Sequence, residues 1–317
     1  MKLNSYPGYE NHLKSYLKDN SEETLAAKKA QGEDMMNYTV PEGMTMEDKM
    51  IPGTEEGTEL KIRIYKPAGL PEKAPVIMDI HGGGWVGGNL DIDNGRCIEL
   101  AQRTPAIVVG VEYRLTTKEV YFPKPLMDCR TAYMWIREHA DEIGGDKERV
   151  GVHGTSAGGN MAGGLALYLR DHNEPAPALT VLVCPQLALE LTRDPSFLQM
   201  HELIMQPDNK AVCPEAMYLG GYNGQTPSYY AFPGECRDYH GLGAHCIIAG
   251  EYDTFRDDAR NYATKLFNTG VPCEILVAPR VGHGFLTVHH PFTDLVHDYI
   301  CSSFRREFSM LDGLKKN

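Results

Sequence analysis

The order of apolar segments along the chain constrains its fold more than any other feature. From about residue 59, short runs rich in β-branched residues alternate with stretches of helical periodicity. This alternation is typical of βα units, which build a mostly parallel sheet with helices on both faces. The predicted strands are Glu59–Tyr65, Pro75–Ile80, Ala106–Tyr113, Arg149–His153, Leu179–Cys184, Ala244–Ala249 and Cys273–Ala278. The predicted helices are Lys124–His139, Met161–Arg170, Asp257–Phe267 and a last one from about Phe292 to Phe308.

Two stretches do not follow this alternation. Residues 1–48 contain one predicted helix, with Ser21 as its N-cap, acidic residues in its first turn and Gly32 as its end. Residues from about 186 to 243 are rich in Met, Pro, Gly and Tyr and are too long for a simple crossover. We interpret both as cover over one end of the sheet, with ordinary surface decoration as the alternative. The chain is thus divided into an N-terminal cap segment, 1–48, and an α/β domain, 49–317, with a cap insertion at about 186–243.

Charge and hydropathy limit the partners of the chain. Lys and Arg number 31 and Asp and Glu number 43, which gives a formal net charge of −12. This balance argues against nucleic acid or an anionic membrane surface as the main partner. No apolar run approaches the ~18 residues of a membrane span, and no apolar segment of a secretory signal follows the residues Met1–Pro7. We therefore expect no nucleic-acid partner and no membrane span.

The distribution of the eight cysteines along the chain indicates the redox state of the compartment in which the protein resides. They are scattered, with no C-x-x-C pair, and several lie in apolar stretches, as Cys184 does after Thr180–Val183. This pattern favours free, mostly buried thiols in a reducing compartment, so we expect a cytoplasmic protein. The alternative is a disulfide, for instance between Cys236 and Cys246.

The candidate nucleophile is Ser156 in the sequence Gly154-Thr-Ser-Ala-Gly158, between a predicted strand and a predicted helix. A nucleophilic hydroxyl must project from a sharp, strained turn, and small neighbours let the backbone segments approach there. The following helix also directs its N-terminus at the site, which favours an anion. The alternative is a glycine-rich turn without a catalytic role.

A second glycine-rich run, His81-Gly-Gly-Gly-Trp85, directly follows the strand Pro75–Ile80. Acyl transfer develops negative charge on a carbonyl oxygen, and preorganised backbone N–H groups must meet that charge. The predicted donors are Gly83, Gly84 and Ala157, with Gly82 serving the turn and His81 and Trp85 in supporting positions. A phosphate-binding loop is the alternative, but neither the Lys-Ser/Thr pair nor the G-x-G-x-x-G spacing of such loops is present.

The candidate base is His283 in Val281-Gly-His-Gly-Phe285, which follows the last predicted strand. Its flanking glycines suit a mobile loop that presents an imidazole. His289, His290 and His297 could suggest a metal, but no cysteine or carboxylate lies at a matching spacing. We interpret these three as surface residues and expect neither a metal nor a cofactor.

The candidate acid is Asp253, which follows the strand Ala244–Ala249 and precedes His283 by 30 residues. The three residues occur in the chain order Ser, Asp, His. One predicted helix and one predicted strand separate Asp253 from His283, so we expect all three residues at one edge of the sheet. Asp257 and Asp258 are rivals, but they occupy the first turn of a predicted helix. Glu251 is a further rival, nearer the strand.

These motifs resemble the hormone-sensitive-lipase-like family of α/β-hydrolase esterases, in the branch with Gly-Thr-Ser-Ala-Gly around the serine. Tyr113-Arg-Leu115 and Phe122-Pro123 are similar to that family's segment after the next strand, and the resemblance covers roughly residues 75–290. It implies an eight-stranded, mostly parallel sheet and a helical cap. It also implies a triad of Ser156, Asp253 and His283. Departures from the family pattern, such as Asp253-Thr-Phe255 for Asp-Pro-Leu, leave these three residues in place.

The resemblance implies a serine carboxylesterase that cleaves short- to medium-chain acyl esters through an acyl-enzyme. The small-molecule ester is then its main partner, and a homodimer is possible through an exposed last strand. Polysaccharide-derived acetyl esters or aryl esters are alternative substrates, and an amidase or an aryl formamidase on the same fold is an alternative activity. A receptor role is the remote one, since the similar plant gibberellin receptors lack the catalytic histidine. An acyl pocket could be lined by the residues Met35, Met36, Met200, Met205, Met217 and Tyr218.

Overall fold

A single eight-stranded sheet forms the centre of the molecule, in the strand order β1-β2-β4-β3-β5-β6-β7-β8. The computed structural model describes residues 4–17, 21–192, 194–200, 214–221 and 227–314. Strand β2 runs antiparallel to β1 and β4, and all pairs from β4 to β8 are parallel. The predicted fold class, a mostly parallel α/β sheet of eight strands, is confirmed.

The seven strands predicted from the sequence are all present, with shifted ends, as β2 to β8, and an eighth strand, β1, precedes them. The bounds are β1 Thr45–Pro52, β2 Glu59–Lys66, β3 Ala74–Ile80, β4 Ile107–Val111, β5 Gly145–Thr155, β6 Thr180–Val183, β7 His245–Tyr252 and β8 Cys273–Gly282. Strands β7 and β8 run several residues further than predicted, which carries them to the edge where polar side chains gather.

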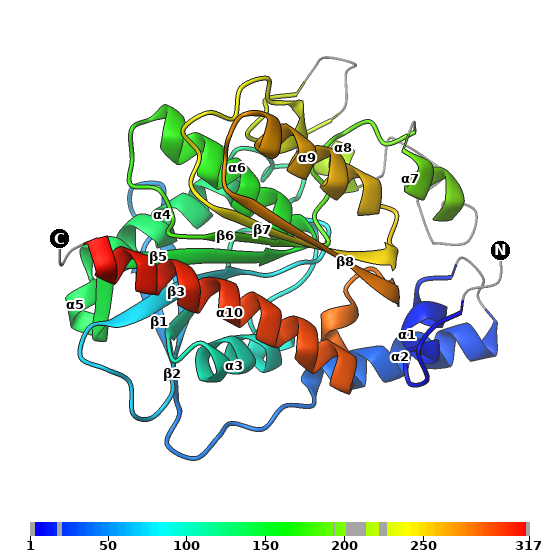
Figure 1. Cartoon of the computed structure of the whole chain (residues 1–317), viewed down its shortest axis with the longest axis horizontal. Helices are drawn as coiled ribbons and strands as arrows, with labels where there is room; N and C mark the ends of the chain where they lie inside the picture. The colour runs from blue at the N-terminus through cyan, green and yellow to red at the C-terminus, as the bar shows by residue number, and fades with distance from the viewer. Residues whose placement is uncertain (1–3, 18–20, 193, 201–213, 222–226, 315–317) are drawn as a thin grey trace.

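Helices cover both faces of the sheet (Figure 1). Helices α3 (Asn94–Arg103) and α10 (Pro291–Leu314) lie on one face, and α4 (Lys124–Glu138), α6 (Ala157–Asp171) and α9 (Arg256–Asn268) lie on the other. The remaining helices are short or terminal: α1 Glu10–Ser15, α2 Glu22–Met36, α5 Ala140–Ile143, α7 Pro195–Met200 and α8 Pro214–Tyr218, with 3₁₀ turns at Asp91–Asp93, Pro233–Glu235 and Phe285–Thr287.

The alternation of side chains along β3 shows how the sheet divides the core into two layers. Val76, Met78 and Ile80 belong to the apolar cluster under α4 and α6, whereas Ile77 belongs to the cluster under α3 and α10. Every residue of β3 is buried. A strand buried on both faces reads as a continuous apolar run, which is why its position could be predicted.

Strand β1 is absent from the sequence predictions. Of its eight residues, only Ile51 is buried. An edge strand with charged, exposed side chains carries no apolar alternation to detect. The predicted division between residues 48 and 49 therefore falls inside this strand.

Three helix boundaries also differ from the predictions by several residues, and one is the end of α10, at Leu314 instead of about Phe308. Helix α2 continues through Gly32 to Met36, because a glycine inside a helix costs only about 1 kcal/mol and does not by itself end it. Helix α6 begins at Ala157, four residues before the predicted Met161, so its first turn directly follows Ser156.

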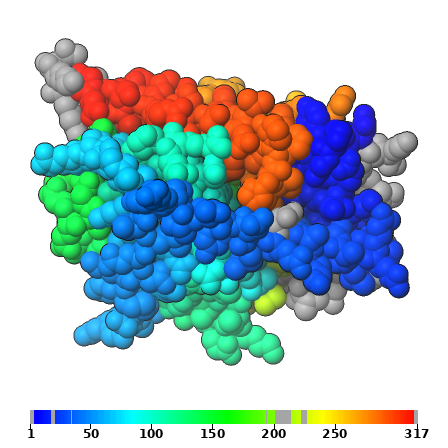
Figure 2. Space-filling view, turned by 90° about the horizontal axis from the view of Figure 1, so that it is seen from below, coloured from blue at the N-terminus to red at the C-terminus, as the bar shows by residue number. Residues whose placement is uncertain are grey.

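The N-terminal helices lie at the end of the sheet where β7 and β8 finish (Figure 1). Figure 2 shows the N-terminal segment beside the start of α10, on the same face of the molecule. Leu13 of α1 packs against Gly282 at the end of β8. None of the helices in the described part of the chain combines the length and the apolar character that a bilayer crossing requires.

The described cysteines carry free thiols, as predicted. Six of them are buried, and Cys273 is half-buried. The alternative disulfide between Cys236 and Cys246 is absent, since both are free. Cys213 lies outside the described residues.

Candidate active site

Ser156 occupies a strained turn between β5 and α6. Its φ of 58° and ψ of −118° lie in a region that non-glycine residues rarely adopt. Glycines make the turn possible: a Cβ on Gly154 would lie 2.3 Å from the carbonyl oxygen of Gly158, and one on Gly158 would lie 2.0 Å from that of Ile80. The turn therefore holds the serine hydroxyl above the N-terminus of α6, as the motif predicts.

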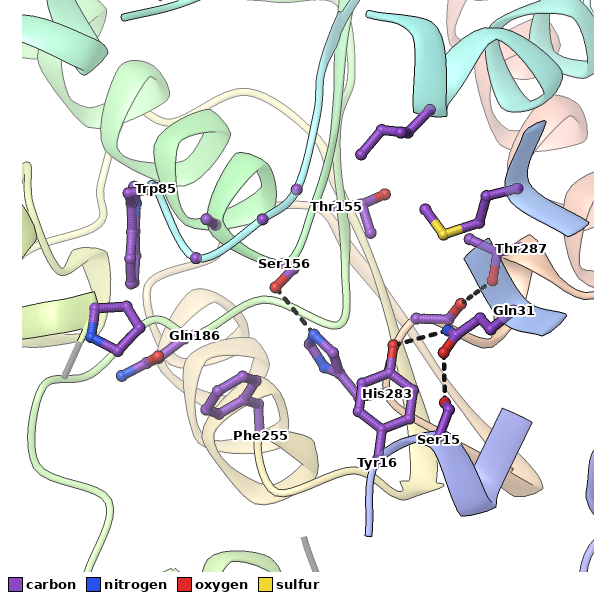
Figure 3. A pocket seen from close by; sticks show the side chains of 18 of the residues that line it. Ser15, Tyr16, Gln31, Trp85, Thr155, Ser156, Gln186, Phe255, His283 and Thr287 are labelled. Carbon is purple, nitrogen blue, oxygen red and sulfur yellow. Dashed lines mark hydrogen bonds between the residues drawn. The ribbon is translucent and has the colours of Figure 1, made fainter. Parts of the chain in front are cut away.

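The structure brings the three predicted polar residues into one hydrogen-bonded chain. Nε2 of His283 lies 2.9 Å from Oγ of Ser156 (Figure 3), and its Nδ1 lies 3.0 Å from Oδ2 of Asp253. Oδ1 of Asp253 accepts a hydrogen bond of 2.9 Å from the N–H of Phe255. Because a carboxylate can only accept, Nδ1 of His283 carries the proton, which leaves Nε2 free to accept the hydroxyl proton of Ser156.

Burial and charge act in opposite directions on His283. Burial alone would lower the pKa of its imidazole, but the negative charge of Asp253 and the hydrogen bond to it outweigh burial and raise that pKa. Asp253 is completely buried, and only 17% of the His283 side chain is exposed. The site therefore stabilises a positive charge on the imidazole.

The rival carboxylates have other partners. Glu251 accepts a hydrogen bond from the N–H of Arg280. Asp257 and Asp258 lie in the first turn of α9, as predicted, and both are buried. Asp257 accepts from the N–H of Ser196, and Asp258 from the N–H groups of Leu187 and Ala188. These two residues thus attach the 186–243 insertion to the α/β domain, and burial raises the pKa of Asp258 to about 7.

The prediction that three further histidines lie on the surface is wrong for one of them. His297 is buried, because α10 places it on the side of the helix that faces the core with Val296 and Ile300. His289 is exposed and His290 is half-buried. Within the described residues, the single group with metal-ligand spacing is Cys184, Asp253 and His283, where the hydrogen-bond chain already uses the carboxylate and the imidazole.

The glycine-rich loop after β3 lies beside Ser156. Gly82, Gly83, Gly84 and Ala157 all line the cavity into which the serine opens. Among the described residues, no group accepts a hydrogen bond from the backbone N–H of Gly83 or Gly84. These N–H groups are thus available to an oxygen atom in the cavity.

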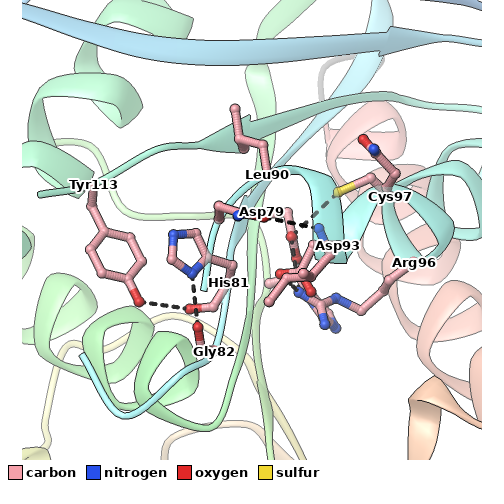
Figure 4. Close-up of polar contacts among 12 residues, drawn as sticks. Asp79, His81, Gly82, Leu90, Asp93, Arg96, Cys97 and Tyr113 are labelled. Carbon is pink, nitrogen blue, oxygen red and sulfur yellow. Dashed lines mark hydrogen bonds and ion pairs between the residues drawn. The ribbon is translucent and has the colours of Figure 1, made fainter. Parts of the chain in front are cut away.

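His81 and Trp85 hold this loop through ring stacking and hydrogen bonds, and Figure 4 shows the contacts of His81. Nδ1 of His81 donates to the carbonyl oxygen of Gly82 at 2.8 Å, and the hydroxyl of Tyr113 donates to the His81 carbonyl at 3.1 Å. The His81 and Tyr113 rings stack with centroids 4.1 Å apart. Trp85 stacks on Tyr218, with centroids 4.7 Å apart. These contacts therefore restrain the loop.

The cavity at Ser156 has a volume of about 560 Å³, within the usual range of small-molecule sites. Its walls come from the sheet edge, from the N-terminal helices and from α8 of the insertion. Of the predicted acyl-pocket residues, only Met35 lines it in the described part of the chain, and Met205 lies outside that part. The predicted residues that do not line it are Met36, Met200, Met217 and Tyr218.

Sequence reasoning missed several residues of the cavity wall. Arg96 and Asp93 line it and belong to a buried cluster with Asp79 (Figure 4), which also pairs with His153. Arg96 lies 3.1 Å from Asp79, and burial raises the pKa of Asp93 to about 6. Other missed residues of the wall are Tyr16, Gln31 and Phe255, and the rings of Tyr16 and Phe255 lie next to His283. No spacing marks them, because they come from segments that are distant in the sequence.

Comparisons with known proteins identify the family. The family described as alpha/beta hydrolase fold matches residues 77–287. Esterase LipI of Mycobacterium tuberculosis is 34% identical over 71% of this chain and 70% of its own length, and carboxylesterase NlhH of the same species is 32% identical over 77% and 76%. The crystal structure of esterase LipW from Mycobacterium marinum superposes with a TM-score of 0.80 at 30% identity and covers 94% of both chains. The chain belongs to the hormone-sensitive-lipase-like family of α/β-hydrolase esterases.

The charge of Asp253 makes a testable contribution to the titration of His283. We expect the imidazole pKa to lie above the ordinary ~6.5 of histidine and to fall when Asp253→Asn removes the charge that raises it. NMR titration of the imidazole resonances measures both values. Glu251→Gln is the matched control, since Glu251 contacts Arg280 rather than the imidazole. An unchanged pKa in Asp253→Asn would contradict this assignment of cause.

Proposed function

We propose that this carboxylic ester hydrolase cleaves short- to medium-chain acyl esters, with Ser156 as nucleophile, His283 as general base and Asp253 as the residue that orients the base. The hydrogen-bonded chain from Asp253 through His283 to Ser156 carries the proposal. It opens into a cavity next to backbone N–H groups of Gly83 and Gly84 that have no protein acceptor among the described residues.

The reaction follows from the protonation state of His283. Nε2 takes the proton of Ser156 Oγ while that oxygen attacks the ester carbonyl. The N–H groups of Gly83, Gly84 and Ala157 stabilise the negative charge that develops on the carbonyl oxygen. The imidazolium, stabilised by Asp253, then protonates the leaving alcohol. In the second half, His283 takes a proton from water while the water oxygen attacks the acyl carbon. The bond between the acyl carbon and Ser156 Oγ then breaks, the imidazolium returns its proton to Oγ, and the acid leaves.

The cap interpretation is part of the proposal. Residues 1–48 and about 186–243 act as the cap, and residues 49–317 provide the catalytic α/β domain. Ser15, Tyr16, Gln31 and Met35 in the first stretch and Pro214 in the second line the cavity, which supports this division. Strand β1 at the end of the first stretch belongs to the sheet, so the part that covers the cavity precedes Thr45.

We also propose that the protein is cytoplasmic and forms a homodimer. The free, mostly buried thiols of the described residues support a reducing compartment. Strand β8 is the last strand of the sheet and offers its outer edge to a second copy. We expect sedimentation velocity to give the mass of two chains at micromolar concentration. A single monomeric species across the concentration range would refute the dimer.

Replacing the nucleophile tests the reaction itself. Ser156→Ala should lower kcat on a p-nitrophenyl ester by about 10⁶, the loss measured for the serine of a comparable protease triad. The matched control is Ser303→Ala, a buried serine on α10 that bonds to Glu274 rather than to the cavity. Near-normal turnover by Ser156→Ala would exclude the proposed function.

The volume of the cavity predicts which lengths of acyl chain the protein accepts. In a p-nitrophenyl ester series from acetate to laurate, kcat/KM should peak at short or medium chains, because a cavity of about 560 Å³ must also hold the leaving group. A flat or rising response up to the C12 ester would contradict the substrate class and leave the catalytic residues unaffected.

A further inference from the structure

The two glycines that flank His283 are packed against helix α1. A Cβ on Gly282 would lie 2.8 Å from a methyl carbon of Leu13. A Cβ on Gly284, where φ is +67°, would lie 2.9 Å from the hydroxyl oxygen of Tyr16. Glycine at these positions therefore provides room for close approach of the N-terminal segment, rather than the mobility that the sequence motif suggested.

His12 of α1 is bonded to the backbone of His283. Nε2 of His12 lies 2.9 Å from the carbonyl oxygen of His283. A carbonyl oxygen only accepts, so Nε2 of His12 donates. His12 is buried, and burial lowers its pKa to about 4. At neutral pH it therefore carries one proton, and this bond uses it.

Gln31 of α2 connects His12 with Tyr16. Its side-chain amide nitrogen donates to Nδ1 of His12 at 3.3 Å and to the Tyr16 hydroxyl at 3.2 Å. Its amide oxygen accepts a hydrogen bond from the hydroxyl of Ser15. The tautomer of His12 is thus fixed on both nitrogens, because Nδ1 accepts while Nε2 donates (Figure 3 shows Gln31 between Tyr16 and Ser15).

Aromatic rings from two different segments flank the His283 imidazole. The Tyr16 ring lies edge-on at a centroid distance of 5.9 Å, and the Phe255 ring lies edge-on at 5.3 Å, both with an interplanar angle of 82°. Both residues line the cavity with His283. Rotation of the imidazole away from Ser156 would therefore need displacement of one of these rings.

We propose that His12 and Tyr16 of the N-terminal segment are positioning residues for His283, so that this segment completes the catalytic geometry as well as covering the cavity. The inference rests on the proposed function of His283 as general base. His12 fixes the backbone from which the imidazole projects, and Tyr16 restricts the imidazole itself. Nucleophile and base must stay in hydrogen-bond distance for proton transfer, and a displacement of about 1 Å can cost about 100-fold in rate.

The test of His12 compares two variants of similar size. His12→Leu fills the buried space without a donor, whereas the side-chain amide of His12→Gln can still donate to the His283 carbonyl. On a p-nitrophenyl ester, we expect His12→Leu to lower kcat by about 10- to 100-fold with KM changed less than about threefold. His12→Gln should recover most of the lost kcat.

The role of Tyr16 is tested with a second pair of variants. Tyr16→Phe keeps the ring beside the imidazole, and Tyr16→Leu removes it. We expect kcat of the Leu variant to be about tenfold below that of the Phe variant, since only the Leu variant frees the imidazole to rotate. Equal values would remove Tyr16 from the proposal.

The controls separate this inference from the proposed function. Lys14→Ala, on the same helix with its side chain paired to Glu23, should leave kcat unchanged. Thermal unfolding of each variant shows whether the fold persists. A normal kcat in His12→Leu, or an equal loss in His12→Leu and His12→Gln, overturns the positioning role. If Ser156→Ala stays active, the proposed function fails instead, whatever the His12 variants do.

Discussion

Parallel pairing of β5, β6, β7 and β8 is the constraint on which the site depends. Parallel strands all finish at the same edge of a sheet, so the residues that follow them meet there. Ser156, Asp253 and His283 follow β5, β7 and β8, and they form one chain of hydrogen bonds despite their separation along the sequence. Each side chain needs only a short loop, because the sheet itself fixes the distances between them.

A rigid edge also explains why the strain at Ser156 persists. The φ of 58° is unfavourable for a serine, and costs of this kind remain only where the surroundings fix the backbone. Here β5 is paired on both sides, and the first turn of α6 packs against the end of β3 through Gly158. The ionic cluster of Asp79, Arg96 and His153 adds a buried network between β3, β5 and α3. The free energy gained by the packed sheet therefore offsets the strain at one residue.

Features that depend on local sequence patterns could be predicted from the sequence. Buried strands such as β3 show as apolar runs, and Ser156 and His283 lie in short motifs at the ends of such strands. Features that depend on tertiary context were not predictable. Strand β1 has one buried residue, and its partner decides its conformation. Tyr16 and Phe255 approach His283 only through the fold, and His297 is buried only because α10 packs on the sheet.

The bond between His12 and the His283 carbonyl spans 271 positions of the chain. Domains form from the N-terminus onward during synthesis, yet α1, which also contacts the neighbouring α2, cannot reach His283 until β8 and the loop after it exist. Contacts of such large sequence separation form slowly, because the entropy of closing the loop must be overcome first. The contact between the earliest helix and the loop of His283 can thus form only after β8 has been synthesised, so a nascent chain that has already built most of its sheet still lacks it.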